Sequence, residues 1–442
     1  MKLIILCSLL SAVIAIPAEL FEPLEAGGKH WALIVAGSNT WDNYRHQADI
    51  CHAYQILSQH GIPDERIVVM MYDDIAHNEQ NPTPGKVINK PNGPDVYHNV
   101  LKDYTGEDVT PDTFLKVLQG DSEGVKGRGS GKVIKSGPKD HVFVNFADHG
   151  APGILAFPSD ELKADDLIMA IKSMHQKKQY KQMVFYVEAC ESGSMFDSIL
   201  PKDINVFATT AANPMESSYA CYYDNERETY LGDVYSVNWM EDSDKENLKV
   251  ETLQKQFEIV RKETNTSHVM EYGMMSLGKL AVSEFQGDTS SEFSNSWTPN
   301  PNIDAVPSQD VRLNILNNRY MAATEDEKQA IMEDINALLK TKTAIELTVK
   351  DIAYKAAKLS YYSADSKSIT DKVINSRLPL TKLDCYFEIY QHLKSGCRTL
   401  DLPKNDYGLR NLYAFVNMCE MGFPAEHVKS SIDSIDSCHY LY

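Results

Sequence analysis

The sequence is poor in three features that mark particular classes of protein. Its eight cysteines contain no Cys-x-x-Cys pair, which argues against a zinc knuckle. Its 43 Lys and Arg are outnumbered by 62 Asp and Glu, and a chain with a net charge of −19 lacks the basic footprint of a nucleic-acid-binding protein. Beyond the N-terminus, no apolar run is long enough to cross a bilayer. We therefore expect neither a nucleic-acid partner nor a membrane span.

The N-terminus carries an apolar run of a different kind. A lysine at position 2 is followed by a short apolar stretch and then by small residues, which is the pattern of a secretory signal peptide over residues 1–17. A glycosylation sequon begins at Asn265, and glycans are attached to such sites in secreted proteins. We therefore expect the protein to enter the secretory pathway.

Half of the cysteines lie close to the C-terminus, whereas the others are scattered through the front of the chain. In an oxidising compartment, four clustered cysteines indicate two disulfides, and these allow three connectivities. The residues alone do not choose among them. The four are Cys385, Cys397, Cys419 and Cys438.

Short apolar runs alternate with helix-like stretches in the front half of the chain. Runs that are apolar on both faces and rich in β-branched residues are typical of a parallel sheet covered by helices on both sides. The clearest helix, 48–61, ends on a glycine. This alternation predicts a doubly wound, mostly parallel α/β domain with flanking helices over residues 18–288. Its expected strands are 31–37, 66–72, 141–147, 183–189 and 204–210.

The back of the chain differs in pattern and in charge. Residues 289–325 are polar and contain prolines, which predicts a linker. Residues 326–442 have a helical period, which predicts an all-α domain closed by the two disulfides. This tail holds 15 Lys and Arg against 16 Asp and Glu, so the acidity of the chain belongs almost entirely to the front part.

Two of the expected strands end in reactive residues. The run HVFVNFADHG ends in His149 and Gly150, and the run VFYVEAC ends in Cys190. In an open α/β sheet, ligands bind where the strands end at their carboxyl edge. An imidazole beside a thiol favours the nucleophilic thiolate, and a glycine lets a substrate carbonyl approach the backbone N–H groups. The pattern therefore indicates a Cys-His nucleophile pair.

Neither residue is specific by itself. A cysteine that ends an apolar run is commonly a buried small hydrophobe, and a histidine after a strand is commonly structural. Two polar motifs at neighbouring strand ends are hard to explain by packing, and together they favour a Cys-His hydrolase. No cofactor or metal ion is expected, because the glycine-rich stretch at 127–132 lacks the spacing of a phosphate-binding loop.

The motifs FADHGAPG and YVEACESGSMF resemble the histidine and cysteine motifs of the legumains, the asparaginyl endopeptidases. SNTWDNYRHQADICHAY, TTAANPMESSYACYYD and YLGDVYSVNWMEDSD are similar to further motifs of that family, and the resemblance extends almost from end to end. It implies a caspase-like fold, a cysteine peptidase that cuts after asparagine, and a C-terminal pro-domain of death-domain-like helices. It also implies delivery to a lysosome or another acidic compartment, or secretion, for example into a gut lumen.

The resemblance also implies catalytic roles. Cys190 is the expected nucleophile, and His149 is the expected general acid and base. Asn43 matches the asparagine that orients the histidine, although a turn residue would be the ordinary reading of it. The backbone N–H groups of Gly150 and Cys190 are the expected oxyanion donors.

A specificity pocket follows from the same resemblance. Arg45 matches a donor to the amide oxygen of asparagine, and Asp233 matches an acceptor from its amide nitrogen. Asp148 matches a position that cyclises to a succinimide in the family, with an ordinary ionised carboxylate as the alternative. The surrounding pocket is expected to contain His46, Glu188, Ser217, Ser218 and Tyr230.

The tail is expected to inhibit the enzyme from within the chain. Arg410 matches a basic residue that approaches the acidic specificity pocket, with a surface arginine as the alternative. Low pH is expected to release the tail, and cleavage of the linker after an asparagine is expected to complete activation. The candidate sites are Asn314, Asn317 and Asn318, and the disulfide pairs that the family implies are Cys385–Cys419 and Cys397–Cys438.

The expected partners are protein and peptide substrates, the protein's own pro-domain and cystatin-type inhibitors. Two other functions remain open. A peptide ligase would resolve the same thioester with an amine, whereas an inactive binding protein of the same fold would not be expected to keep Cys190, His149, Asn43 and Gly150 together.

Overall fold

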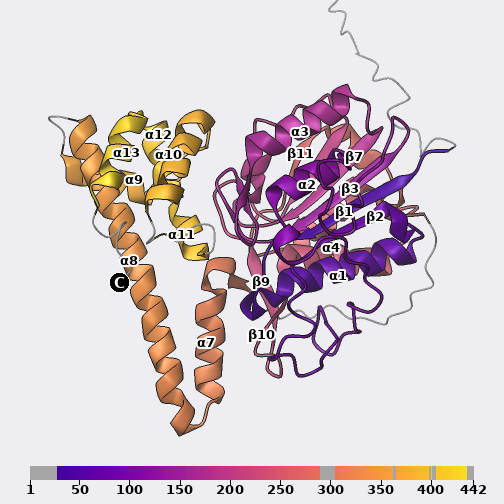
Figure 1. Cartoon of the computed structure of the whole chain (residues 1–442), viewed down its shortest axis with the longest axis horizontal. Helices are drawn as coiled ribbons and strands as arrows, with labels where there is room; N and C mark the ends of the chain where they lie inside the picture. The colour runs from indigo at the N-terminus through magenta and orange to yellow at the C-terminus, as the bar shows by residue number, and fades with distance from the viewer. Residues whose placement is uncertain (1–26, 289–303, 362–364, 398–399, 401–404, 436–442) are drawn as a thin grey trace, which may run out of the picture.

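The computed structural model describes residues 27–288, 304–361, 365–397, 400 and 405–435. Within these residues the centre is a six-stranded sheet in the order β11-β8-β7-β3-β1-β2 (Figure 1). Neighbouring strands are parallel except that β11 runs antiparallel to β8. The strands are β1 (His30–Ala36), β2 (Ile67–Met70), β3 (His141–Ala147), β7 (Gln182–Glu188), β8 (Val206–Thr210) and β11 (Met270–Gly273).

All five strands expected from the sequence are present, and the predicted α/β sheet is confirmed. Every residue of β2, β3, β7 and β8 is buried, because helices cover both faces of the sheet. One face packs against α1 (Tyr44–Gln59), α4 (Val234–Lys245) and α5 (Leu253–Glu263), which share one hydrophobic core with it. The other face packs against α2 (Pro111–Leu118) and α3 (Ala164–Gln176), which share the second core.

The register of the sheet places the ends of its central strands level with one another. Ala36 of β1 pairs with Ala147 of β3, and Ala147 pairs with Glu188 of β7. The residues that follow these strands therefore emerge at the same carboxyl edge. Two smaller sheets lie in the same chain, one formed by β4 (Gly150–Ala151), β5 (Ile154–Ala156) and β6 (Glu161–Lys163), the other by β9 (Tyr219–Asp224), β10 (Thr229–Asp233) and β12 (Val306–Pro307).

The tail is helical, as expected, and its helices lie beside the sheet domain (Figure 1). The predicted disulfide Cys385–Cys419 is present and joins α10 to α12. The other predicted pair, Cys397–Cys438, includes a residue outside the described ranges. The helices are α8 (Glu325–Ser360), α9 (Ser366–Asn375), α10 (Leu383–Gly396), α11 (Asp406–Asn411), α12 (Tyr413–Glu420) and α13 (Ala425–Asp433).

Part of the segment that the sequence predicts as a linker is folded. Residues 306–322 form β12, the 3-10 turn η7 (Ser308–Asp310) and α7 (Val311–Ala322). Asn314, Asn317 and Asn318 therefore lie within a helix in this form, and cleavage after them requires α7 to unwind. No helix in the described ranges is long and apolar enough to cross a membrane.

Candidate active site

Cys190 lies two residues beyond the end of β7, at the carboxyl edge of the sheet. Glu191 follows it in the left-handed backbone region, with φ of 49°, before the 3-10 turn η5 (Ser192–Met195). This conformation is uncommon for a residue other than glycine and marks a sharp change of direction. The chain turns away from the strand and leaves the thiol at its tip, 6% exposed.

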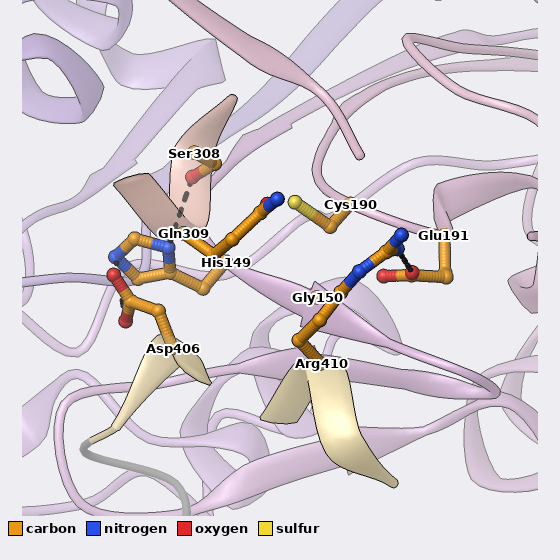
Figure 2. A pocket seen from close by; sticks show the side chains of 8 residues that line it. All are labelled: His149, Gly150, Cys190, Glu191, Ser308, Gln309, Asp406 and Arg410. Atoms are coloured by element: carbon orange, nitrogen blue, oxygen red, sulfur yellow. Dashed lines mark hydrogen bonds and ion pairs between the residues drawn. The ribbon is translucent and has the colours of Figure 1, made fainter. Parts of the chain in front are cut away.

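His149 follows β3 in the same way, and Gly150 opens β4. A Cβ atom on Gly150 would lie 2.2 Å from the carbonyl oxygen of Cys190, so no larger residue fits between the two strand ends. The structure thus brings the three residues together, as the sequence predicts. They line one pocket (Figure 2) with Glu191, Ser308, Gln309, Asp406 and Arg410.

Asn43 holds one edge of the His149 ring. Its amide nitrogen donates to the carbonyl of Asn39 at 2.9 Å, and its side-chain oxygen lies 2.9 Å from Nε2 of His149. Because an amide oxygen only accepts, Nε2 carries the proton and Nδ1 is the acceptor. The hydroxyl of Ser308 lies 3.3 Å from Nδ1, and Oδ1 of Asp406 lies 3.3 Å from Nε2. The ring is therefore contacted on both nitrogens by segments outside the sheet domain.

The reactive pair is uncharged in this form. Burial lowers the pKa of His149 to about 4, although Asp406 opposes the shift. Burial raises the pKa of the Cys190 thiol to about 12, and the negative charge of Glu191 adds to the effect. At neutral pH the chain thus holds a thiol and a neutral imidazole, and the nucleophilic thiolate is not formed.

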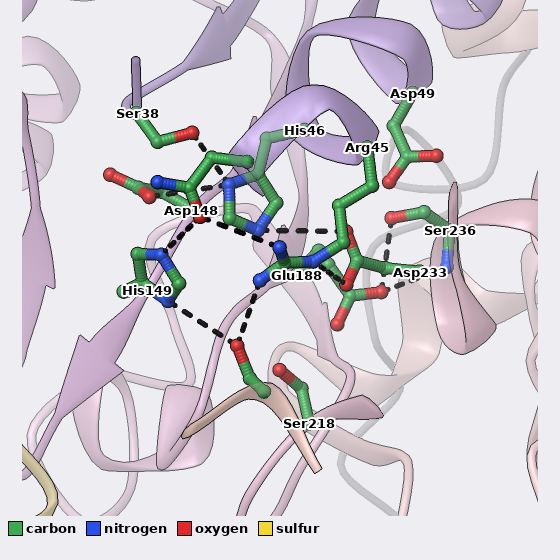
Figure 3. A network of polar contacts seen from close by, with 12 residues as sticks. Ser38, Arg45, His46, Asp49, Asp148, His149, Glu188, Ser218, Asp233 and Ser236 are labelled. Carbon is green, nitrogen blue, oxygen red and sulfur yellow. Dashed lines mark hydrogen bonds and ion pairs between the residues drawn. The ribbon is translucent and has the colours of Figure 1, made fainter. Parts of the chain in front are cut away.

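A second group of residues forms a buried network of polar contacts beside His149 (Figure 3), which we call the hollow after the specificity pocket that the sequence predicts. Arg45 of α1 and Asp233 at the end of β10 are each 1% exposed, and Nε of Arg45 donates to Oδ1 of Asp233 at 2.9 Å. The terminal Nη2 of Arg45 donates to the hydroxyl of Ser308 at 3.0 Å. Ser308 therefore contacts both the guanidinium of the hollow and the ring of His149.

The hollow also offers acceptors. Oε2 of Glu188 accepts from the backbone N–H and the hydroxyl of Ser236, at 2.9 and 3.1 Å, whereas its Oε1 has no donor within reach. Oδ2 of Asp233 likewise has no hydrogen-bond donor. Burial raises the pKa of Glu188 well above its ordinary value, and the charge of Asp233 raises it further. A bound group that brings N–H donors would satisfy these oxygens.

Other predicted pocket residues lie nearby. His46 contacts the hydroxyl of Ser38 at 2.6 Å, and burial keeps its pKa well below the ordinary value, with Arg45 and His149 lowering it further. Its contacts with the carboxylates of Asp148 and Asp233, at 3.4 and 3.6 Å, are therefore those of a neutral ring. Asp148 is buried beside His149, and a succinimide at this position stays a prediction.

The three remaining pocket residues have different surroundings. The hydroxyl of Ser218 lies 3.7 Å from the sulfur of Cys190, and that of Ser217 donates to the side chain of Gln309. Tyr230, however, donates to Asn314 at 2.7 Å and packs against α7. The structure thus places Tyr230 in the contact between β10 and α7.

The sequence did not reveal the residues that fill the site. Ser308 and Gln309 come from the segment that the sequence predicts as a linker, and Asp406 comes from the tail. Val306 and Pro307 pair with Ala220 and Tyr219 of β9, so the chain enters the site as an added antiparallel strand. A polar, proline-containing stretch gives no signal of such a role. Arg410 enters the pocket around Cys190, and its partner is not a carboxyl of the specificity pocket: its Nη1 lies 2.5 Å from Oε1 of the buried Glu191.

One group in this region has the residue types of a metal site. Ligand atoms of His46, Asp148 and His149 lie within 4.8 Å of one another. His46 is held by Ser38 and His149 by Asn43, so both rings already have polar partners. No step proposed below passes through a metal.

Comparison with known proteins agrees with the motifs. The model of the peptidase C13 family matches residues 30–288, and that of the legumain prodomain matches residues 333–438. Among solved structures, a caspase-1 from Spodoptera frugiperda covers 60% of this chain and 93% of its own, at 12% identity and a TM-score of 0.35, a likeness too small to carry an argument.

Curated relatives match nearly the whole chain. It is 52% identical over 436 residues to a legumain of Bos taurus, covering 98% of each protein. It is 43% identical to a hemoglobinase of Schistosoma japonicum, covering 92% of each, and 41% identical to a legumain of Canavalia ensiformis, covering 93% of this chain and 89% of that protein. The chain therefore belongs to the peptidase C13 family, as a legumain-type cysteine peptidase with its prodomain.

Proposed function

We propose that the protein hydrolyses peptide bonds on the carboxyl side of asparagine, and that the form described here is its latent precursor. The observation that carries the proposal is the hollow beside Cys190. Arg45 directs a donor into it, and Glu188 and Asp233 each present an oxygen without a donor. A side-chain amide has one acceptor and two donors, so asparagine matches this set.

The chemistry follows from the residues at the strand ends. His149 takes the proton of the Cys190 thiol, the sulfur attacks the substrate carbonyl, the C–N bond breaks, and the amine leaves with that proton. Water then attacks the thioester and gives a proton to His149, the C–S bond breaks to release the acid, and the proton returns to the sulfur. The N–H groups of Gly150 and Cys190 stabilise the oxyanion, and Asn43 keeps Nδ1 of His149 toward the reacting atoms.

The latent state follows from the contacts of Ser308 and of the tail. Ser308 takes the donor of Arg45 that a substrate amide oxygen would need, and it also covers Nδ1 of His149. Arg410 and Asp406 of the tail line the same pocket as Cys190. Substrate therefore enters only after both segments leave.

The direct test compares peptides that differ only in the residue before the cleaved bond. After acid activation, a peptide with asparagine is expected to be cut at least about 100-fold faster than one with glutamine or alanine, because a site built on hydrogen bonds rejects side chains that leave its groups unpaired. An alkylating agent that blocks the thiol is the control and should stop all cleavage. Equal cleavage of the three peptides would show that the hollow does not recognise the asparagine side chain.

Cleavage after aspartate is expected to depend steeply on pH. An ionised aspartate would meet the carboxyls of Asp233 and Glu188, whereas its protonated form imitates asparagine. With an ordinary aspartate pKa of about 3.9, the protonated fraction rises roughly tenfold for each pH unit lost above that value. The rate for aspartate relative to asparagine should therefore rise roughly 100-fold between pH 7 and 5. A ratio independent of pH would contradict the model.

The ion pair of Arg410 is expected to maintain latency at neutral pH. Burial raises the pKa of Glu191 to about 7, although Arg410 lowers it. Because this pKa is raised, Glu191 is about half ionised at pH 7, and the attraction is complete only at higher pH. Arg410→Ala removes the pair at any pH, which weakens docking by about 1–2 kcal/mol, a factor of roughly 5–30.

The measurement for Arg410→Ala is the cleavage rate of the full-length variant at neutral pH, before any acid treatment. Lys429→Ala is the matched control, because it removes an exposed pair with Glu388 inside the tail, at 2.6 Å. The control should stay as latent as the unaltered chain. Equal latency of the Arg410 variant would show that this pair does not hold the tail.

The remaining proposals concern processing and location. Asn265 is exposed just after α5, which suits a glycan. The signal peptide of residues 1–17, the lysosomal or secreted destination, the pair Cys397–Cys438 and inhibition by cystatin-type proteins agree with the family and stay proposals. Peptide ligation by the same thioester is the alternative outcome, and a peptide with a free N-terminus would capture it as a joined product.

A further inference from the structure

Three carboxyl groups and one guanidinium are buried behind the specificity hollow. Asp49, Glu188 and Asp233 are each 1% exposed, as is Arg45. Asp49 lies on α1, one turn after Arg45. Three ionised carboxylates against one cation would leave two uncompensated charges away from water, which is strongly unfavourable. Protons must therefore be held within this group.

The polar contacts on the far side of Asp49 fix how it is oriented. His52 lies 2.8 Å from Oδ1 of Asn89 through Nδ1, and 3.0 Å from Oδ2 of Asp244 through Nε2. Burial opposes a charge on His52, but Asp244 raises its pKa above the ordinary value, and an acceptor oxygen faces each ring nitrogen. The oxygen of Asn89 therefore faces the ring, and its NH₂ donates to Oδ1 of Asp49 at 2.7 Å and to the carbonyl of Leu231 at 2.9 Å.

On the near side Asp49 meets Asp233. Figure 3 shows its side chain reaching from α1 toward that residue. Oδ2 of Asp49 and Oδ2 of Asp233 are both buried, and neither has a donor within reach. Two carboxyls can share a hydrogen bond only if one of them is protonated. Packing is tight, since a Cβ atom on Gly232 would lie 3.2 Å from Oδ1 of Asp49.

The surroundings decide which carboxyl keeps the proton. Burial raises the pKa of Asp49 well above its ordinary value, and the charges of Asp233 and Glu188 raise it further. Burial also raises the pKa of Asp233, but Arg45 lowers it, as does the neighbouring Asp49. The proton therefore belongs to Asp49. The titratable groups that face Asp49 are Asp233 of β10, Glu188 of β7 and Cys221 of β9, with Arg45 and Cys51 on its own helix.

We propose that Asp49 is a positioning residue of the specificity hollow, a neutral carboxylic acid that donates a hydrogen bond to Asp233 and holds it as the ionised acceptor for the substrate amide. This inference rests on the proposed cleavage after asparagine. The pair of Asp49 and Asp233 then carries a single negative charge, which balances Arg45. An acceptor whose charge Arg45 balances suits an uncharged side chain and disfavours an ionised aspartate.

The first test uses two substitutions of Asp49. Asp49→Asn imitates the neutral acid, because its oxygen accepts from Asn89 and its NH₂ donates to Asp233. It should keep kcat/KM for the asparagine peptide within about threefold, with an unchanged pH dependence of the aspartate-to-asparagine ratio. Asp49→Ala has no donor and should raise KM about tenfold or more, with a smaller change in kcat.

An ionised Asp49 would give a different result in the same test. If Asp49 were ionised, Asp49→Asn would remove a negative charge from the hollow, and cleavage after aspartate at neutral pH would rise about tenfold or more. That rise, or a loss of activity in Asp49→Asn as large as in Asp49→Ala, would overturn the proposal. The rescue by asparagine separates positioning from a merely structural effect, which both substitutions would share.

A second measurement does not depend on activity. The infrared difference between the full-length protein and Asp49→Asn at neutral pH should contain the C=O band of a protonated carboxylic acid. Asp121→Asn, at an exposed carboxylate, is the control and should change no such band. A missing band would refute a neutral Asp49 even in an enzyme that cuts after asparagine. A band in a protein that does not cut there would refute the proposed function and leave the protonation of Asp49 standing.

Discussion

Cys190→Ala is expected to lower kcat/KM for an asparagine peptide by at least about a thousandfold, because no other group at the strand ends can form the thioester. Loss of a catalytic nucleophile leaves only the contribution of binding and of the oxyanion donors. The substitution removes one sulfur atom from a side chain that is 6% exposed, so the fold and the docking of the tail should persist. Rates are measured after acid activation, on protein whose unfolding temperature has been checked.

The matched control is Cys51→Ala. Cys51 is a buried thiol on α1 that contacts the sulfur of Met71 at 3.9 Å and does not line the pocket around Cys190. Its loss should cost about 1 kcal/mol or slightly more in stability and leave the activity of the folded enzyme unchanged. If Cys190→Ala kept its activity, or if both variants lost it equally, Cys190 would not be the nucleophile.

The positions of Cys190 and His149 were predictable because they depend on strand order and register. Buried apolar runs located the strands, and the rule that ligands bind at the carboxyl edge placed Cys190 and His149 on one side. The structure agrees because β3 and β7 are neighbours and pair with their ends level, Ala147 opposite Glu188. At this edge, the local sequence pattern and the tertiary arrangement place the two residues at the same point.

The residues of the hollow, and the Ser308 that occupies its donor, could not be predicted from strand order and register. Arg45 and Asp233 meet across 188 residues of sequence, and as isolated residues both would be read as surface charges. Only the family resemblance singled them out. Ser308 and Asp49 had no such signal. A serine in a polar stretch and an aspartate on a helix become significant only when folding buries them beside Arg45 and Asp233.

This burial also explains why the hollow is sensitive to its single cation. Asp233 and Glu188 are surrounded by protein, and their pKa values are raised mainly because water is excluded. Arg45 acts against that shift at both carboxyls. Removing the guanidinium therefore changes the protonation of the acceptors as well as deleting a donor.

Arg45→Met is accordingly expected to lower kcat/KM for the asparagine peptide by roughly a thousandfold. Methionine fills much of the volume but leaves the substrate amide oxygen without a donor, and breaking a buried ion pair costs about 3–5 kcal/mol. Part of that cost will appear as reduced stability, because Asp233 either stays charged without its partner or takes up a proton. Arg45→Lys should retain more activity than Arg45→Met, since it keeps the charge without the planar fork.

Arg227→Met separates loss of specificity from general damage. Arg227 is also a buried arginine, 5% exposed, and it contacts Asp224 at 3.6 Å on the hairpin that carries Asp233. Its replacement should reduce stability, whereas the preference for asparagine over glutamine in the folded enzyme should not change. Arg45→Met should lose that preference even where the protein stays folded. If Arg45→Met kept it, the guanidinium would not read the substrate amide, and the selectivity would have to come from the shape of the hollow instead of its charges.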